Sequence, residues 1–141
     1  MPTIDSWFDR YGESHRHPLN KALHWICVPA ITWSVIALAW WLSPYAALAL
    51  CVGALAFYAW LSRTIAAGMA VVVALALASL PQVTANLAVV AIAVFVVAWI
   101  GQFVGHAVEG RKPSFADDVK FLLIGPAWLL GAAYRRFDIR Y

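Results

Sequence analysis

Two long stretches without any charged side chain constrain this chain more than any other feature. They cover residues 22–62 and 64–108, which are 41 and 45 residues long, and Arg63 alone separates them. A helix needs about 20 apolar residues to cross a bilayer, so each stretch is long enough for two crossings. Charged residues make up 12% of the chain, about half the share in a typical soluble domain. The sequence therefore predicts an integral membrane protein.

Turn residues divide each stretch into two expected spans. Ser43-Pro44 divides the first stretch and Pro81-Gln82 divides the second. Isolated strands cannot satisfy their backbone groups in lipid, and the chain lacks the alternating pattern of a membrane barrel, so the spans are predicted to be helices. The predicted fold is an all-α integral membrane domain over residues 1–141, with four transmembrane helices arranged as two hairpins. The expected spans are residues 26–42, 45–61, 65–80 and 83–104.

Two further segments are predicted to lie at the membrane surface. Residues 4–14 are charged and amphipathic, which predicts an N-terminal amphipathic helix. An apolar run at residues 119–134 is interrupted by Gly125-Pro126 and is followed by arginines, so we expect a re-entrant or interfacial helix there. Ser114 and Asp117 have the spacing of a capping box, which predicts that this last helix starts near Ser114.

Lys and Arg residues predict the orientation of the four spans. They precede the first span, occur at Arg63 and follow the fourth span, whereas the other two loops carry none. The positive-inside rule then places both termini in the cytoplasm, in a bacterial inner membrane or in the endoplasmic reticulum of a eukaryote. Six tryptophans near the expected interfaces are typical of an aromatic belt: Trp25, Trp40, Trp41, Trp60, Trp99 and Trp128. The net charge of +3 fits contact with anionic lipid, so we expect the bilayer and no nucleic acid as a partner.

The four histidines are predicted to gather at one membrane face. His15, His17 and His24 precede the first span and His106 follows the fourth. Two hairpins return the chain to the side from which it started, so these side chains reach a similar depth. His17 precedes Pro18, which favours the first position of a helix, so a helix start alone explains this histidine.

Helical spacing adds polar partners to these histidines. Asn20 and His24 share one helix face, and Gln102, His106 and Glu109 follow one helical stripe. Neutral imidazoles with a carboxylate suit a non-haem Fe(II) centre that keeps positions open for oxygen and substrate. Simpler explanations exist for each residue: a lone histidine at an interface, or an ion pair of Glu109 with Arg111 or Lys112. Glu109, His17 or water are open alternatives for a fourth ligand.

Two motifs resemble the 2-hydroxy fatty acid dioxygenase family of fungal phytosphingosine breakdown, which has bacterial homologues. The first motif is Tyr11-x3-His15-x4-Asn20-x3-His24 followed by Val28-Pro29, and the second is Gln102-Phe103-Val104-Gly105-His106 followed by Glu109 and Pro113. Gly125-Pro126 is a third, weaker match. Cys27 departs from the family, in which many members have Gly, and we expect this difference to affect only packing.

The resemblance implies an Fe(II) enzyme that uses molecular oxygen to shorten a 2-hydroxy fatty acid by one carbon. It implies that His15, His24 and His106 lie at the iron, with Glu109 and Asn20 as ligands or partners of ligands. Tyr11 and Gln102 are further candidates for partners of the imidazoles or of the substrate. We expect Lys21, Arg16 or Arg111 to hold the substrate carboxylate.

Two other classes of function compete with the dioxygenase. A haem-binding electron carrier would use His24 and His106 as axial ligands, but no further haem signature is present. A non-enzymatic small membrane protein would tolerate loss of the histidines. A transporter is less well supported, because no charged residue lies near the middle of a span.

Overall fold

The computed structural model describes residues 2–141 and contains no strand in that range. The helices are α1 (Ile4–Gly12), α2 (Pro18–Leu42), α3 (Pro44–Leu61), α4 (Arg63–Ser79), α5 (Leu87–Glu109) and α6 (Phe121–Arg136), with short 3-10 turns η1 (Leu80–Gln82) and η2 (Ser114–Ala116). The predicted all-α class is therefore confirmed. Four helices are long and apolar enough to cross a membrane: α2, α3, α4 together with η1, and α5.

Capping groups, rather than the ends of the apolar runs, set the bounds of these helices. Helix α2 begins at Pro18, eight residues before the predicted span, because the His17 side chain accepts a hydrogen bond from the Leu19 amide at 3.1 Å. Helix α5 begins after Asn86, whose side chain caps the Val89 amide. It ends at Gly110, which has a φ of 73° that favours glycine.

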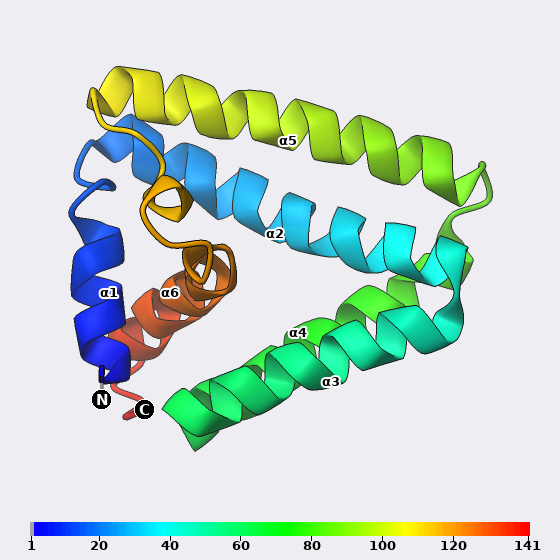
Figure 1. Cartoon of the computed structure of the whole chain (residues 1–141), viewed down its shortest axis with the longest axis horizontal. Coiled ribbons are helices and arrows are strands. Elements are labelled where there is room, and N and C mark those ends of the chain that lie inside the picture. Colours follow the sequence, from blue (N-terminus) through cyan, green and yellow to red (C-terminus); the bar gives the residue numbers. More distant parts are fainter. Residues whose placement is uncertain (1) are drawn as a thin grey trace.

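The four long helices form two pairs that differ from the predicted hairpins. Helix α2 packs along α5, and α3 packs along α4. The pairs meet where the chain turns at Ser43 and at residues 80–86, and they diverge towards the other end (Figure 1). Helices α2 and α3 contact each other as the first predicted hairpin requires, but α5 packs along α2 instead of its sequence neighbour α4.

Two glycines allow α5 to approach α2 closely. A Cβ atom added at Gly101 would lie 2.6 Å from Cys27 Sγ, and one added at Gly105 would lie 2.4 Å from Asn20 Oδ1. Neither separation is possible without movement, so a larger residue at either position would force the helices apart. Glycines spaced four apart are a common device for bringing membrane helices together. The Cys27 thiol thus occupies the space that Gly101 leaves open.

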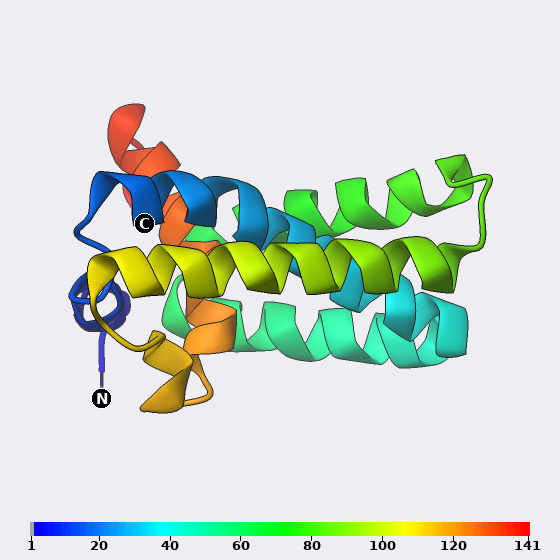
Figure 2. The same ribbon diagram turned by 90° about the horizontal axis from the view of Figure 1, so that it is seen from above.

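Helices α1 and α6 fill the wide end, where the two pairs diverge. Both run across the long axis of the molecule, as comparison of Figures 1 and 2 shows. Their apolar side chains form the main core cluster with residues of α3 and α4: Ile4, Trp7, Phe8, Tyr11, Tyr58, Ile65, Met69, Phe121, Ile124 and Ala127. Tyr58 also donates a hydrogen bond from its hydroxyl to the carbonyl of Leu123 at 2.7 Å, which fastens α6 to α3.

The predicted interfacial segment corresponds to α6, with two differences. The helix continues through Gly125-Pro126 instead of breaking there. The capping box does not start it, because Ser114–Ala116 forms a 3-10 turn and α6 begins only at Phe121. The Ser114 hydroxyl is used elsewhere, in a contact with Ser14 that is described below.

The close approach of α2 and α5 predicts the effect of adding a methyl group. Gly105→Ala places a Cβ against Asn20 and should destabilise the protein by about 1–3 kcal/mol, the usual cost of overpacking. Gly53→Ala is the matched control, because a Cβ there has nothing within 4 Å and alanine favours the helix. Thermal unfolding in detergent should give a lower midpoint for Gly105→Ala alone; equal midpoints for both variants would contradict the observed packing.

Candidate metal centre

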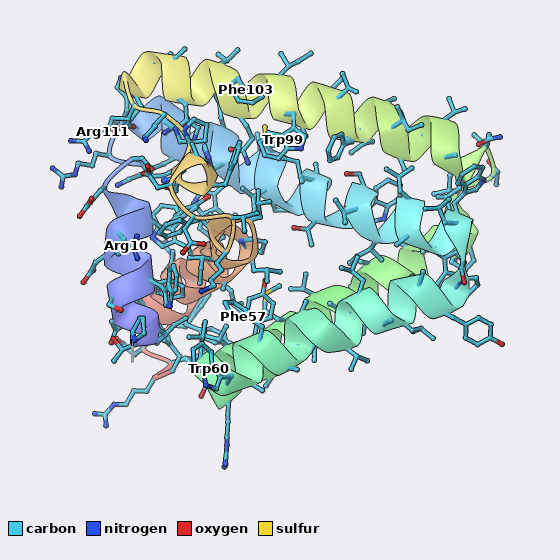
Figure 3. The ribbon with its side chains drawn as sticks, in the orientation of Figure 1. Arg10, Phe57, Trp60, Trp99, Phe103 and Arg111 are labelled. Carbon is cyan, nitrogen blue, oxygen red and sulfur yellow. The ribbon has the colours of Figure 1, made fainter. Side chains whose placement is uncertain are left out.

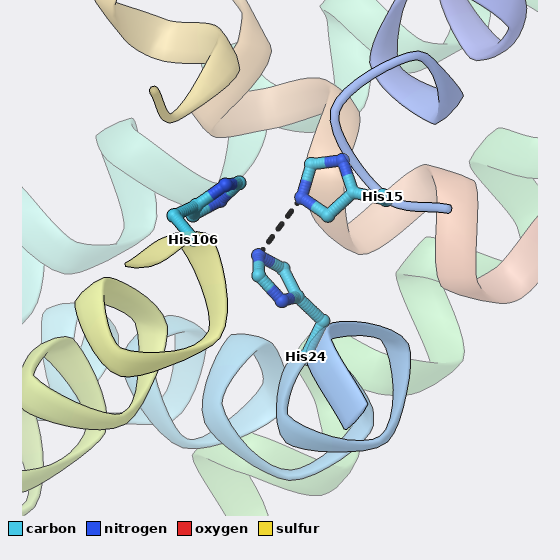
Figure 4. Close-up of side chains that lie close together, drawn as sticks. All are labelled: His15, His24 and His106. Atoms are coloured by element: carbon cyan, nitrogen blue, oxygen red, sulfur yellow. Dashed lines mark hydrogen bonds between the residues drawn. The ribbon is translucent and has the colours of Figure 1, made fainter. Parts of the chain in front are cut away.

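Three histidines from separate parts of the chain meet at the wide end of the molecule. His15 lies in the loop before α2, His24 in α2 and His106 in α5 (Figure 4). Their side chains are 1%, 1% and 5% exposed. One nitrogen from each ring lies within 4.8 Å of the other two, an arrangement that can hold a metal ion. His17, by contrast, is exposed and caps α2.

Backbone hydrogen bonds determine which nitrogens of His15 and His24 carry protons. The Nδ1 atom of His15 lies 2.6 Å from the carbonyl oxygen of Tyr11, and that of His24 lies 2.8 Å from the carbonyl oxygen of Asn20. A carbonyl can only accept, so both Nδ1 atoms are donors. In the neutral rings, both Nε2 atoms then carry lone pairs, as is usual for histidines that bind metals.

The two Nε2 atoms face each other at a distance of 2.9 Å. Two lone pairs repel at this distance, and a cation between them would remove the repulsion. Two nitrogens that bind one ion at right angles through bonds of about 2.1 Å stand about 3 Å apart. Burial and the nearby His24 lower the pKa of His15 to about 3, so this imidazole is uncharged near neutral pH. The donor set therefore fits a metal ion.

The third ring contributes an unsatisfied polar atom. His106 Nδ1 is buried and has no hydrogen-bond partner within residues 2–141. Its ring centre lies 4.8 Å from that of His15 and 5.0 Å from that of His24. Leaving a buried nitrogen without a partner costs about 1–3 kcal/mol. An orphaned nitrogen beside two converging lone pairs is a further sign that this cluster is built for a cation.

Glu109 lies beside the cluster and outside its group of ligand atoms. Its carboxylate accepts hydrogen bonds from the backbone amides of Arg16 at 3.0 Å and His17 at 2.6 Å, and from Asn20 Nδ2 at 3.3 Å. These amides precede α2, where the helix dipole favours a negative charge. Glu109 thus joins the end of α5 to the loop that carries His15.

Aromatic rings hold the His15 imidazole in place. Tyr11 stacks on it with ring centres 4.1 Å apart and an angle of 11° between the planes. A Cβ at Gly125 would lie 2.9 Å from the Tyr11 hydroxyl, so this glycine allows Tyr11 to lie against α6. Burial raises the pKa of Tyr11, and the phenol therefore adds no charge. Trp128 packs against both rings: its ring centre lies 5.2 Å from that of Tyr11 and 5.5 Å from that of His15.

A cavity of about 50 Å³ adjoins the three histidines. Its polar wall includes Gln102, and its apolar wall includes Trp99, Val28 and Phe121. The loop after α5 covers one side and is held there by a 2.6 Å hydrogen bond between the hydroxyls of Ser14 and Ser114. The volume is enough for one or two molecules of the size of water or oxygen.

The cations that were expected to bind a carboxylate do not line this cavity. Arg16, Lys21 and Arg111 are exposed, and the residues around the cavity include no lysine or arginine. Arg111 extends outward beyond the end of α5 (Figure 3). The structure thus brings Tyr11, Asn20, Gln102 and the three histidines together, and it separates them from these charges.

Two tryptophans were assigned to an aromatic belt by sequence but belong to the centre. Trp99 lines the cavity, and Trp128 packs against His15. Helical spacing contains a signal for Trp99, because this residue is three positions before Gln102 and seven before His106 on the same stripe. No comparable signal marks Trp128, whose position depends on how α6 crosses the bundle.

These features define a class: a helical protein with four helices able to span a membrane and a buried site of three histidines suited to a metal ion. A family model described as "2-hydroxy-palmitic acid dioxygenase Mpo1-like" matches residues 1–137. The chain therefore belongs to the Mpo1-like family, which confirms the resemblance seen in its motifs. No curated protein and no solved structure matches the chain.

Metal binding should depend on the three buried histidines and not on Glu109. Each of His15→Ala, His24→Ala and His106→Ala removes a donor. Loss of a residue that only hydrogen-bonds to a metal ligand weakens metal binding about 10–100-fold. Each of these three substitutions removes a ligand atom itself and should weaken Fe(II) binding by more than that. Glu109→Gln keeps one of the two oxygens that accept from the loop amides and should still bind iron stoichiometrically. Anaerobic loading followed by elemental analysis measures this; loss of iron from Glu109→Gln would contradict the prediction.

Proposed function

We propose that this protein is an Fe(II)-dependent dioxygenase that shortens 2-hydroxy fatty acids by one carbon. The observation that carries the proposal is the pair of His15 and His24 Nε2 lone pairs, 2.9 Å apart and next to His106. The family description names a dioxygenase of a 2-hydroxy fatty acid, which supports the same reaction class. Iron(II) is the proposed cofactor, and molecular oxygen and a 2-hydroxy fatty acid are the proposed substrates.

Three neutral imidazoles suit ferrous iron, because they leave coordination positions for small ligands. Once bound, ferrous iron supplies a positive centre that holds the carboxylate and hydroxyl of the acid and an electron source that activates oxygen. The hydrogen bonds to the Tyr11 and Asn20 carbonyls keep the His15 and His24 rings oriented. Because no lysine or arginine lines the cavity, the charge of the carboxylate would be balanced by the ion that the three histidines hold.

The proposed reaction balances without another co-substrate. A 2-hydroxy acid, R-CH(OH)-COOH, and one molecule of oxygen give the shorter acid R-COOH, carbon dioxide and water. The bond between the carboxyl carbon and its neighbour breaks, and the acid itself supplies the electrons that reduce oxygen. Gln102 is the polar side chain of the cavity wall closest in sequence to His106. We assign it to hold the substrate hydroxyl or carboxylate by hydrogen bonding.

The geometry favours a single ion over a haem. A haem needs a flat space between its axial ligands. The ring centres of His24 and His106 are only 5.0 Å apart, and the His15 ring lies 4.2 Å from His24. The adjoining cavity of about 50 Å³ is also far smaller than a porphyrin. We therefore place the bare metal ion ahead of the electron carrier as the function of this site.

The orientation of the chain follows from its charges. Both termini lie at the wide end with α1 and α6 (Figure 1), and the opposite turns at Ser43 and residues 80–86 carry no charge. By the positive-inside rule, we propose that the wide end and its histidines face the cytoplasm. The membrane would be the inner membrane of a bacterium or the endoplasmic reticulum of a eukaryote.

Oxygen consumption tests the proposed reaction. Protein loaded anaerobically with Fe(II) should consume oxygen when 2-hydroxyhexadecanoate is added and should release pentadecanoate and carbon dioxide. His106→Ala should abolish both signals because it removes one donor of the cluster. His17→Ala is the matched control, since this histidine is exposed and caps α2, and it should retain activity. Protein that binds iron stoichiometrically but does not consume oxygen with this acid would contradict the proposed substrate.

A further inference from the structure

A second, larger cavity lies between α2, α4 and α6. It has a volume of about 240 Å³, compared with about 50 Å³ for the cavity at the histidines. Helix α2 contributes one wall, and α4 and α6 contribute the others. Its lining consists of Trp25, Val28, Pro29, Thr32, Trp33, Met69, Val72, Ala76, Pro126, Leu129, Leu130 and Ala133. The lining contains no charged residue, so the space suits a hydrocarbon.

Two polar side chains of this lining, Thr32 and Trp33, use their donors within the protein. The Thr32 hydroxyl donates to the carbonyl of Val28 at 2.9 Å. The Trp33 indole N–H donates to the hydroxyl of Ser79 at 2.8 Å, which also ties α2 to α4. A ligand in this cavity therefore meets no free donor from Thr32 or Trp33, and apolar contact is the main interaction that the lining offers.

The two cavities share part of their walls. Val28, Thr32 and Pro126 line both of them. The apolar cavity therefore lies directly beside the histidine cavity. A molecule that fills both would place a small polar head at the histidines and an apolar chain between α2, α4 and α6.

The volume of the cavity at the histidines limits which head group can enter it. Its volume of about 50 Å³ is too small for the phosphate and glycerol of a phospholipid. A bilayer lipid would therefore have to lie with its head elsewhere. The wall shared with the histidine cavity favours a fatty acid as the occupant.

We infer that this apolar cavity, a groove between α2, α4 and α6, binds the hydrocarbon chain of the 2-hydroxy fatty acid. This inference rests on the proposed function, because it assumes that the head of the acid lies at the histidines. Val72 and Ala76 of α4 line the part of the groove contributed by that helix. Their size then limits the length of chain that the groove accepts.

A photoreactive fatty acid tests this location without using activity. The probe is 2-hydroxyhexadecanoate with a diazirine near the end of its chain, added in the absence of oxygen to Fe(II)-loaded protein in nanodiscs, so that the head group has its ion and no turnover occurs. Mass spectrometry should find the label on α4 and α6 residues of the groove, and unlabelled 2-hydroxyhexadecanoate should displace it. Label on outward-facing residues, or label that excess phospholipid displaces and the acid does not, would overturn the inference.

Tryptophan substitutions at two alanines of α4 test whether the groove limits the length of the fatty acid chain. Ala76→Trp fills the groove, whereas Ala74→Trp adds the same bulk on an exposed part of the same helix. Ala76→Trp should reduce groove labelling and lower the turnover of 2-hydroxyhexadecanoate relative to 2-hydroxyoctanoate about tenfold or more. Val72→Trp is the second groove variant if Ala76→Trp does not fold. Equal chain-length ratios in the groove variants and the Ala74→Trp control would contradict the inference.

The two measurements separate failure of this inference from failure of the proposed function. Turnover of the acid with label outside the groove would overturn the location and leave the reaction intact. Label in the groove that the acid displaces, in protein that never consumes oxygen, would support the binding site and contradict the dioxygenase.

Discussion

The close approach of α2 and α5 is the contact on which the rest of the structure depends. Because Gly105 has no side chain, Asn20 lies directly against α5. The same contact brings His24 and His106 to a ring separation of 5.0 Å. It also brings Glu109 to the start of α2, where its carboxylate accepts hydrogen bonds from the two backbone amides that follow His15. A wider separation would disperse all three histidines at once.

The divergence of the two helix pairs has the opposite role, since it creates space. Helix α6 lies in that space beside two neighbouring cavities, one next to the histidines and one between α2, α4 and α6. Burying two imidazoles whose lone pairs face each other, as those of His15 and His24 do, is unfavourable without a cation. Metal binding would relieve this cost and stabilise the fold, because an ion that binds only the folded state adds to its stability. The centre would then couple folding to metal binding.

The sequence was sufficient to predict the class of the fold and the meeting of the histidines. Charge-free stretches define four apolar helices whatever their packing, and the turns between them return His24 and His106 to one end. The neighbours of each helix could not be predicted from hydropathy, because all four spans have similar apolar faces. The spacing of Gly101 and Gly105 did contain a signal for the α2–α5 contact. The spacing alone does not identify the partner helix, which is known only from the positions of Cys27 and Asn20 opposite these glycines.

Individual side chains were harder to assign than helices. Glu109 follows the stripe of His106, so spacing suggested a ligand, yet one further turn carries its carboxylate to the amides of Arg16 and His17. Ser114 has the spacing of a helix cap, but its hydroxyl bonds to Ser14 instead. In both cases local spacing fixed the direction of a side chain and not its partner, which comes from a segment about 100 residues away in the chain.

X-ray absorption at the iron edge of the Fe(II)-loaded protein tests the central claim most directly. If His15, His24 and His106 hold the ion, the spectrum should show scattering from three imidazole rings, with nitrogen bonds of about 2.1 Å. The multiple scattering of a porphyrin, or a spectrum without imidazole rings, would contradict the assignment of these histidines as a non-haem iron centre.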